Sequence, residues 1–271
     1  MNAYISSPRQ HGVPAFGGIH AGRSEGFRMP QFFKRLFKLS QMDFEMAVWE
    51  MTRLIVAPKK VFRSVYYHKQ TKNTWHRPDP SFTYLLSFFL LLTALAWGLA
   101  YTSSATGVVR LTLVFIFVHF LGVSLLVSTI AYFLAGRVLG NTIAGLPGRR
   151  RQGLFEPRGG DQLEFGYCFD VAIRAYFPVW VFLYVVQFFM MPLLSKDYWI
   201  SIFLGNTIYL VAAGYYTVIS FLGYNALPFL HHTELLLFPI VVYLVLWLVS
   251  LIGGFNIARH VAPAFLAGAR G

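Results

Sequence analysis

The sequence predicts an all-α integral membrane protein with five transmembrane helices. Of its 271 residues, 56% are hydrophobic and only 13% are charged, which is too apolar for a soluble domain of this size. The apolar residues gather in five segments, each about long enough to cross a ~30 Å hydrocarbon layer. A segment of this length satisfies its backbone hydrogen bonds in lipid by forming a helix. The predicted spans are Phe82–Tyr101, Val108–Phe133, Val171–Leu194, Ile200–Gly223 and Leu235–Gly253.

The distribution of positive charge predicts the topology. The formal net charge is +12, and 13 of the 23 Lys and Arg residues precede Ser81. Five more arginines lie in the second loop, residues 136–170, and the other connections hold few. Because Lys and Arg accumulate in cytosolic loops, we expect the N-terminal region and this Arg-rich loop to be cytosolic. Five spans then leave the tail, residues 255–271, in the lumen, and residues 81–254 form the membrane domain.

Two further regions precede the first span. Residues 1–30 are rich in Gly, Ser and Pro, and we expect a disordered cytosolic leader there. Residues 31–80 form a basic amphipathic region. It begins with Gln31–Leu39, which has the pattern of a short helix lying in a headgroup layer or against the protein's own helices.

A second amphipathic helix is expected from Gln41 to about Val56. Ser40 to Asp43 has the spacing of a capping box, and Pro58 disfavours helical geometry in the residue before it. Its apolar stripe is predicted to leave the charged residues largely off the packed face. The stripe consists of Phe44, Ala47, Val48, Met51 and Ile55, and the charged residues are Asp43, Glu45, Glu50 and Arg53.

The segment Lys59–Pro80 mixes cations with aromatic residues, and three interpretations remain open. It is a positive flank of the first span with interfacial aromatics, a docking surface for a cytosolic protein, or a nucleic-acid-binding segment. No nucleic-acid-binding fold signature accompanies the third interpretation.

Several polar residues, prolines and glycines interrupt the apolar sequence of the spans. Asp170 and Arg174 are spaced to pair on one face of the third helix, and Asn206 is placed to hydrogen-bond across a helix interface in the fourth. His119 lies in the second span. Prolines predict kinks in the third and fifth helices, and glycines predict close helix approach in the fourth. These residues are Pro178, Pro239, Gly205, Gly214 and Gly223.

No residue set points to catalysis, so we expect a protein that is not an enzyme and uses no cofactor. Cys168 lies among apolar residues without a nearby histidine, which indicates an inert thiol. His231, His232 and Glu234 lack the spacing of a metal site, and no metal is expected.

Several stretches, in order over about residues 31–253, resemble the Unc-fifty (uncoordinated-fifty) family. In the first half of the chain they are Gln41-Met-Asp-Phe-Glu45 followed by Trp49, His68-Lys-Gln-Thr-Lys72 with Trp75, and Asp79-Pro80. In the second half they are Glu164-Phe-Gly-Tyr167, Phe169-Asp170-Val171, Gly205-Asn-Thr207, Gly214-Tyr-Tyr216 and Phe221-Leu-Gly-Tyr-Asn-Ala-Leu-Pro-Phe-Leu230. The chain departs from the family before Gln31, in the Arg/Gly-rich insert 140–160 and after Gly253. Arg174 is a cation that the family pattern does not require.

The resemblance implies a five-span Golgi membrane protein with a cytosolic N-terminus and a non-enzymatic role in membrane traffic. It implies recruitment of the exchange factors that activate Arf GTPases, and delivery of receptors of the nicotinic acetylcholine type to the cell surface. RNA binding is also proposed within the family, as are the endoplasmic reticulum and the inner nuclear membrane as locations.

The sequence therefore predicts an adaptor anchored in the Golgi membrane. Candidate partner-binding residues lie in the cytosolic region, and candidate intramembrane polar residues lie in the third and fourth spans. The first set is Asp43, Glu45, Trp49, Lys69, Lys72 and Trp75, and the second is Asp170, Arg174 and Asn206. Two alternatives remain: a small transporter or lipid-handling protein using the second set with His119, and an RNA-binding membrane protein.

Overall fold

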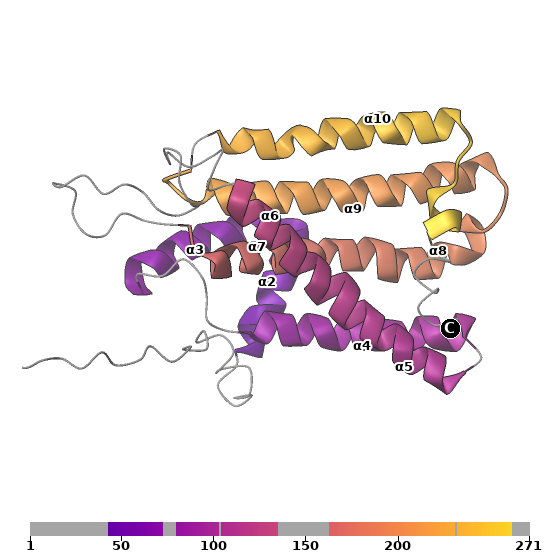
Figure 1. Ribbon diagram of the computed structural model, residues 1–271, viewed down its shortest axis with the longest axis horizontal. Helices are drawn as coiled ribbons and strands as arrows, with labels where there is room; N and C mark the ends of the chain where they lie inside the picture. Colours follow the sequence, from indigo (N-terminus) through magenta and orange to yellow (C-terminus); the bar gives the residue numbers. More distant parts are fainter. Residues whose placement is uncertain (1–42, 73–79, 103, 135–162, 231, 262–271) are drawn as a thin grey trace, which may run out of the picture.

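The computed structural model describes residues 43–72, 80–102, 104–134, 163–230 and 232–261, and these residues are helical without strands (Figure 1). The leader, the Arg-rich insert and the tail of the predicted domain organisation lie outside them in whole or in large part. Two helices precede the first span: α2 (Phe44–Val56) and α3 (Pro58–Lys72).

Five helices are long and apolar enough to cross a membrane, which confirms the predicted fold class. Two are interrupted by π-helical turns but remain continuous. The first two spans are α4 (Ser81–Tyr101) and the run α5 (Ala105–Leu113), η2 (Val114–Gly122) and α6 (Val123–Leu134). The third is α7 (Phe165–Trp180), η4 (Val181–Val186) and α8 (Gln187–Leu194). The last two are α9 (Trp199–Asn225) and the pair η5 (Thr233–Leu237) and α10 (Phe238–Ile252).

Two predicted helix starts need correction. The third span begins at Phe165 rather than Val171, because Glu164 is its extended N-cap residue and the turns up to Asp170 are already helical. The second amphipathic helix begins at Phe44 rather than Gln41. Asp43 has non-helical dihedral angles and caps it. The helix ends at Val56, as Pro58 predicted, but the chain then re-enters a helix, since proline is tolerated at the first helical position.

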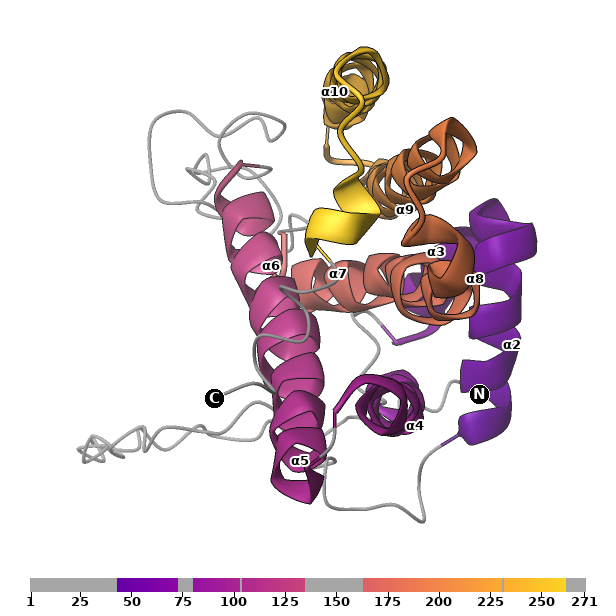
Figure 2. The same ribbon diagram turned by 90° about the vertical axis from the view of Figure 1, so that its right-hand side faces the viewer.

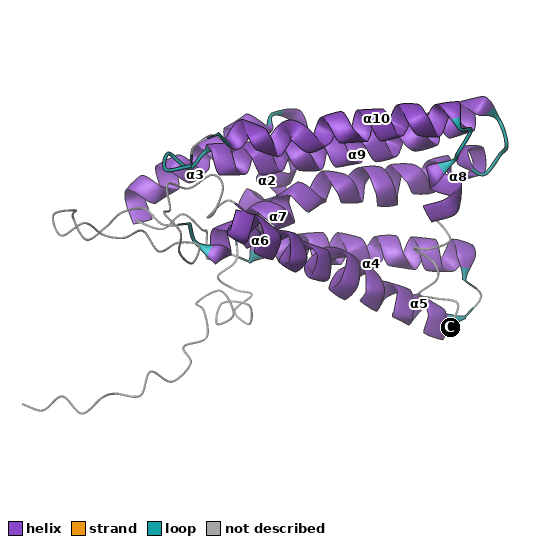
Figure 3. Ribbon diagram, turned by 45° about the horizontal axis from the view of Figure 1, so that its top comes forward, coloured by secondary structure: helices purple, strands orange, loops and turns teal. Residues whose placement is uncertain are grey.

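The spans α4, α9 and α10 run along the bundle, the second span (α5–η2–α6) crosses it obliquely, and α2 lies across it (Figures 1 and 2). We call the end of the bundle where α4 and α7 begin and α9 ends the α2–α3 end (Figures 1 and 3). Figure 2 shows α4, α9 and α10 nearly along their axes, whereas α2 is seen from the side at the outer edge of the bundle. Helix α2 therefore lies roughly perpendicular to these spans.

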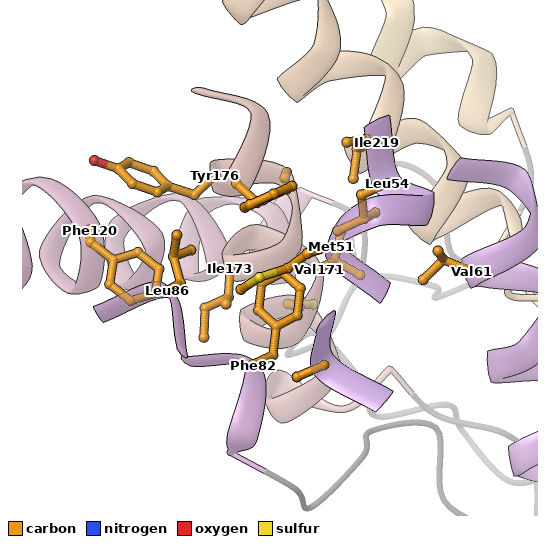
Figure 4. Close-up of a cluster of buried hydrophobic side chains, with 14 of the residues drawn as sticks. Met51, Leu54, Val61, Phe82, Leu86, Phe120, Val171, Ile173, Tyr176 and Ile219 are labelled. Carbon is orange, nitrogen blue, oxygen red and sulfur yellow. The ribbon is translucent and has the colours of Figure 1, made fainter. Parts of the chain in front are cut away.

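The core is centred on α7, which packs against α2, α6 and α9. Side chains from several helices converge there, including Met51 and Leu54 of α2, Phe82 of α4 and Val171 of α7 (Figure 4). By contrast, α10 has no buried residue and packs mainly along α9. Helices α2 and α3 are thus part of the same hydrophobic core as the spans.

The two π-helical segments, η2 and η4, meet inside the bundle. The Tyr184 hydroxyl shares a 2.9 Å hydrogen bond with Nδ1 of His119 and accepts another from the Tyr176 hydroxyl. Nε1–H of Trp97 donates to the Tyr184 carbonyl at 2.9 Å. Pro178 precedes η4, and the helix continues there with π-type turns. The kink predicted at Pro239 is wrong, because this proline is the second residue of α10.

Two of the three glycines singled out in the fourth span mark close approaches. A Cβ at Gly223 would lie 2.7 Å from Cγ1 of Val171, and one at Gly205 would lie 3.1 Å from Cβ of Ala258. Gly214 faces open space, so the close approach expected there is wrong.

Candidate functional site

A hollow of about 290 Å³ lies beside α2 at the α2–α3 end of the bundle. Three residues of α2, its N-cap residue and one residue of α3 line the hollow. They are Asp43, Glu45, Met46, Trp49 and Ser64. The hollow therefore brings together three of the six residues that the sequence marked for partner binding.

The acidic rim of the hollow is positioned by the start of α2. The Asp43 carboxylate accepts a 3.0 Å hydrogen bond from the Met46 backbone N–H, as an N-cap residue does. Glu45 is exposed in the first turn, where a negative charge interacts favourably with the helix dipole. Both carboxylates are thus fixed near one helix end by local geometry.

The apolar wall of the hollow consists of partly exposed side chains. Trp49 is 38% exposed and Met46 is 42% exposed, and the Arg53 guanidinium lies 5.7 Å from the centre of the Trp49 ring. An aromatic face next to carboxylates is complementary to a side chain with an apolar stem and a cationic end. The hollow thus combines two carboxylates with an apolar wall.

A buried ion cluster fastens α2 to the third span. Glu50 accepts hydrogen bonds of 3.2 and 3.1 Å from Nε and Nη2 of Arg174, and both side chains are 4% exposed. Asp170 forms the predicted ion pair with Arg174 one turn earlier in α7. The guanidinium carbon also lies 5.6 Å from the centre of the Phe82 ring. One cation thus joins α2, α4 and α7.

Helix α3 is fixed at the same end by a close contact with α9. The Phe62 ring and Val171 crowd the Cα of Gly223, and any side chain there would displace them. The Tyr167 hydroxyl donates a 2.6 Å hydrogen bond to the Gly223 carbonyl, which ties α7 to the last turn of α9. The hollow therefore lies between two helices, α2 and α3, that are each anchored to the bundle.

The sequence profile of the UNC-50 family matches residues 32–266. The chain belongs to the UNC-50 family. It is 41% identical to a protein GMH1 homolog of Schizosaccharomyces pombe over 85% of this chain and 94% of that protein. It is 36% identical to a protein unc-50 homolog of Danio rerio, with 94% of each chain covered. No solved structure matches the chain.

As a member of this family, the chain is a membrane protein whose five apolar helices require a lipid bilayer around them. The structure does not describe the side chains of the remaining partner-binding candidates of this UNC-50 protein. Lys69 and Lys72 belong to α3, but the placement of their side chains is not described, and Trp75 lies outside the described residues. Their roles stay predictions.

The candidate intramembrane residues do not form one site. Asp170 and Arg174 lie at the α2–α3 end, whereas Asn206 lies near the opposite end of α9. Nδ2 of Asn206 donates to Oγ of Ser250 at 2.9 Å and to the Phe255 carbonyl at 2.8 Å. Asn206 thus makes the expected hydrogen bond across a helix interface and holds the chain that follows α10.

Sequence reasoning missed Glu50. It was placed off the packed face of α2, but it is 3% exposed and shares the buried face with Ala47, Met51 and Leu54. These four positions have the spacing of one helix face, so the sequence pattern already indicated that Glu50 lies on the buried face. Arg174 supplied a second signal, because a cation inside a span calls for carboxylate partners. Phe44 and Val48, assigned to the stripe, are 40% and 51% exposed.

Proposed function

We propose that this UNC-50 protein is a non-enzymatic adaptor of Golgi membrane traffic. The α2–α3 end faces the cytosol and binds a trafficking factor at the hollow, and the five spans anchor that factor at the membrane. The factor we propose is an exchange factor for Arf GTPases, whose recruitment then supports delivery of receptors of the nicotinic acetylcholine type. The family resemblance supports this choice of partner and cargo.

The single observation that carries the proposal is the hollow beside α2. Its carboxylates and its Trp49 ring are partly open to solvent, while the opposite face of α2 is buried against the spans. The Glu50–Arg174 pair fixes that orientation. A partner bound at the hollow is therefore held at a fixed position relative to the membrane, as an adaptor requires.

The proposal is tested by recovering the exchange factor from cells with the full chain carrying Asp43→Asn and Glu45→Gln. Asparagine caps a helix about as well as aspartate, so α2 keeps its start while the hollow loses both charges. We expect recovery of the exchange factor to fall by about tenfold, the effect of losing ~1.4 kcal/mol of binding. The amount of protein in the Golgi membrane should stay unchanged.

The matched control is Glu234→Gln, which removes an exposed carboxylate from η5 without touching the hollow. A Trp49→Ala variant tests the apolar wall independently of charge. Undiminished recovery of the exchange factor with both the charge variant and Trp49→Ala would refute the hollow as the docking site.

The two alternatives are less well supported by the described residues. A transport path would need its polar groups in a line, but Arg174 is paired with two carboxylates and Asn206 is occupied at the opposite end. RNA binding would depend on the region around Lys69 and Trp75 and stays a prediction.

A further inference from the structure

The depth of α2 relative to the bilayer follows from helix lengths. Leu194 lies 20 residues after Arg174 in the third span and is followed by Ser195 and then by the charged residues Lys196 and Asp197. Twenty helical residues rise about 30 Å, which is the thickness of the hydrocarbon layer. Arg174, and Glu50 paired with it, therefore lie at the boundary between hydrocarbon and headgroups.

The first span gives the same depth independently. Helix α4 has 21 residues, so its length of about 31 Å only just crosses the hydrocarbon. Phe82, its second residue, lies against Arg174. Because α2 is roughly perpendicular to the spans, its whole length stays near this boundary rather than extending into the cytosol (Figure 2).

The two flanks of α2 differ in chemistry. On one side of its buried face lie Met46 and Trp49, which line the hollow together with the carboxylates. On the other side lie Phe44 and Val48, one helical turn apart and about half exposed. A helix lying along the boundary directs one flank toward the acyl chains and the other away from them. The flank without charges, at Phe44 and Val48, is the one suited to the acyl chains.

Helix α3 adds positive charge at the same end of the bundle. Lys59, Lys60 and Arg63 are exposed on the side opposite the buried residues Val61 and Phe62. Among the described residues, none of these three cations has a carboxylate partner. Cations that stay unpaired beside a lipid boundary are complementary to anionic headgroups.

We propose that helices α2 and α3 together form a lipid-binding element that selects anionic phospholipids of its own leaflet. Phe44 and Val48 insert at the level of the upper acyl chains, and the cationic face of α3, Lys59, Lys60 and Arg63, contacts the phosphate groups. The hollow remains on the opposite flank, open to a cytosolic partner. The lipid contact requires no particular partner, so it stands or falls independently of the adaptor proposal.

The first test measures the depth of α2 in the full chain, reconstituted in vesicles of phosphatidylcholine with phosphatidylserine. A nitroxide is attached at Val48→Cys, and in a matched variant at Glu45→Cys, while the buried Cys168 stays unlabelled. We expect the label at position 48 to collide preferentially with oxygen, which partitions into lipid, and the label at 45 with a water-soluble nickel chelate. Equal access of the chelate to both labels would overturn the insertion of this flank.

The second test measures lipid selection with spin-labelled lipids in the same vesicles. The wild type should hold phosphatidylserine in preference to phosphatidylcholine, and Lys60→Gln with Arg63→Gln should lower that preference about two- to fivefold. The control variant, Arg110→Gln with Lys196→Gln, removes the same charge at the opposite end of the bundle and should retain most of it. An unchanged preference in the α3 variant, or an equal loss in the control, would assign the cations to an acidic protein or RNA and overturn the proposal.

Discussion

Replacing Glu50 with methionine should release α2 from the bundle without unfolding the spans. Methionine is close to glutamate in length and leaves the buried Arg174 without its partner from α2. Removing one partner of a buried ion pair costs about 3–5 kcal/mol. Asp170 remains beside Arg174 and is 21% exposed, so the lower limit of about 3 kcal/mol applies.

Hydrogen exchange of α2 is the direct assay for this release. The backbone amides of α2 exchange through local opening, and their exchange rates report its free energy. A loss of about 3 kcal/mol corresponds to roughly a hundredfold faster exchange in α2. Amides of α9, whose contacts with α7 do not involve Glu50, should exchange as in the wild type.

Two further variants separate charge from shape. Glu45→Gln changes an exposed carboxylate of the same helix and should speed exchange only by the helix-dipole contribution, at most about fivefold. The double variant Glu50→Met with Arg174→Met replaces the pair by apolar side chains and should restore protection to within about 1 kcal/mol of the wild type. Unaltered exchange of α2 in Glu50→Met alone would refute the argument that this ion pair fastens α2 to the third span.

Two other substitutions test the packing that surrounds the site. Gly223→Ala should cost about 1–3 kcal/mol, because its methyl group overlaps Val171, while Gly214→Ala, in open space, should be neutral when thermal unfolding in detergent is compared. Asn206→Leu leaves the Ile257 N–H and the Phe255 carbonyl without their partner, and should cost about 1–3 kcal/mol. Exchange of the Ile257 amide should rise in that variant, and a protected Ile257 would contradict this role.

The spans could be predicted from the sequence because a helix that crosses lipid needs a continuous apolar segment of about 20 residues, and such a segment is recognised from the sequence alone. The helix α3 could not, since its sequence is polar on average and its helix depends on Val61 and Phe62 packing against the bundle. Asp170 with Arg174 was predictable from local spacing. The contact between Glu50 and Arg174 joins residues 124 positions apart and depends on how α2 crosses α7.

Helix α2 carries exposed residues suited to two different environments, lipid and a protein partner, and its position allows both. Its exposed apolar residues favour lipid, and its carboxylates and indole ring favour a protein partner. A helix standing out into the cytosol would expose both sets to water, where the apolar residues would destabilise the monomer. A helix lying along the membrane boundary, fixed in rotation by Glu50, separates them onto two flanks. Rotation of α2 about its axis would exchange those flanks, so under the two proposals we expect loss of the ion pair to disturb lipid contact and partner access together.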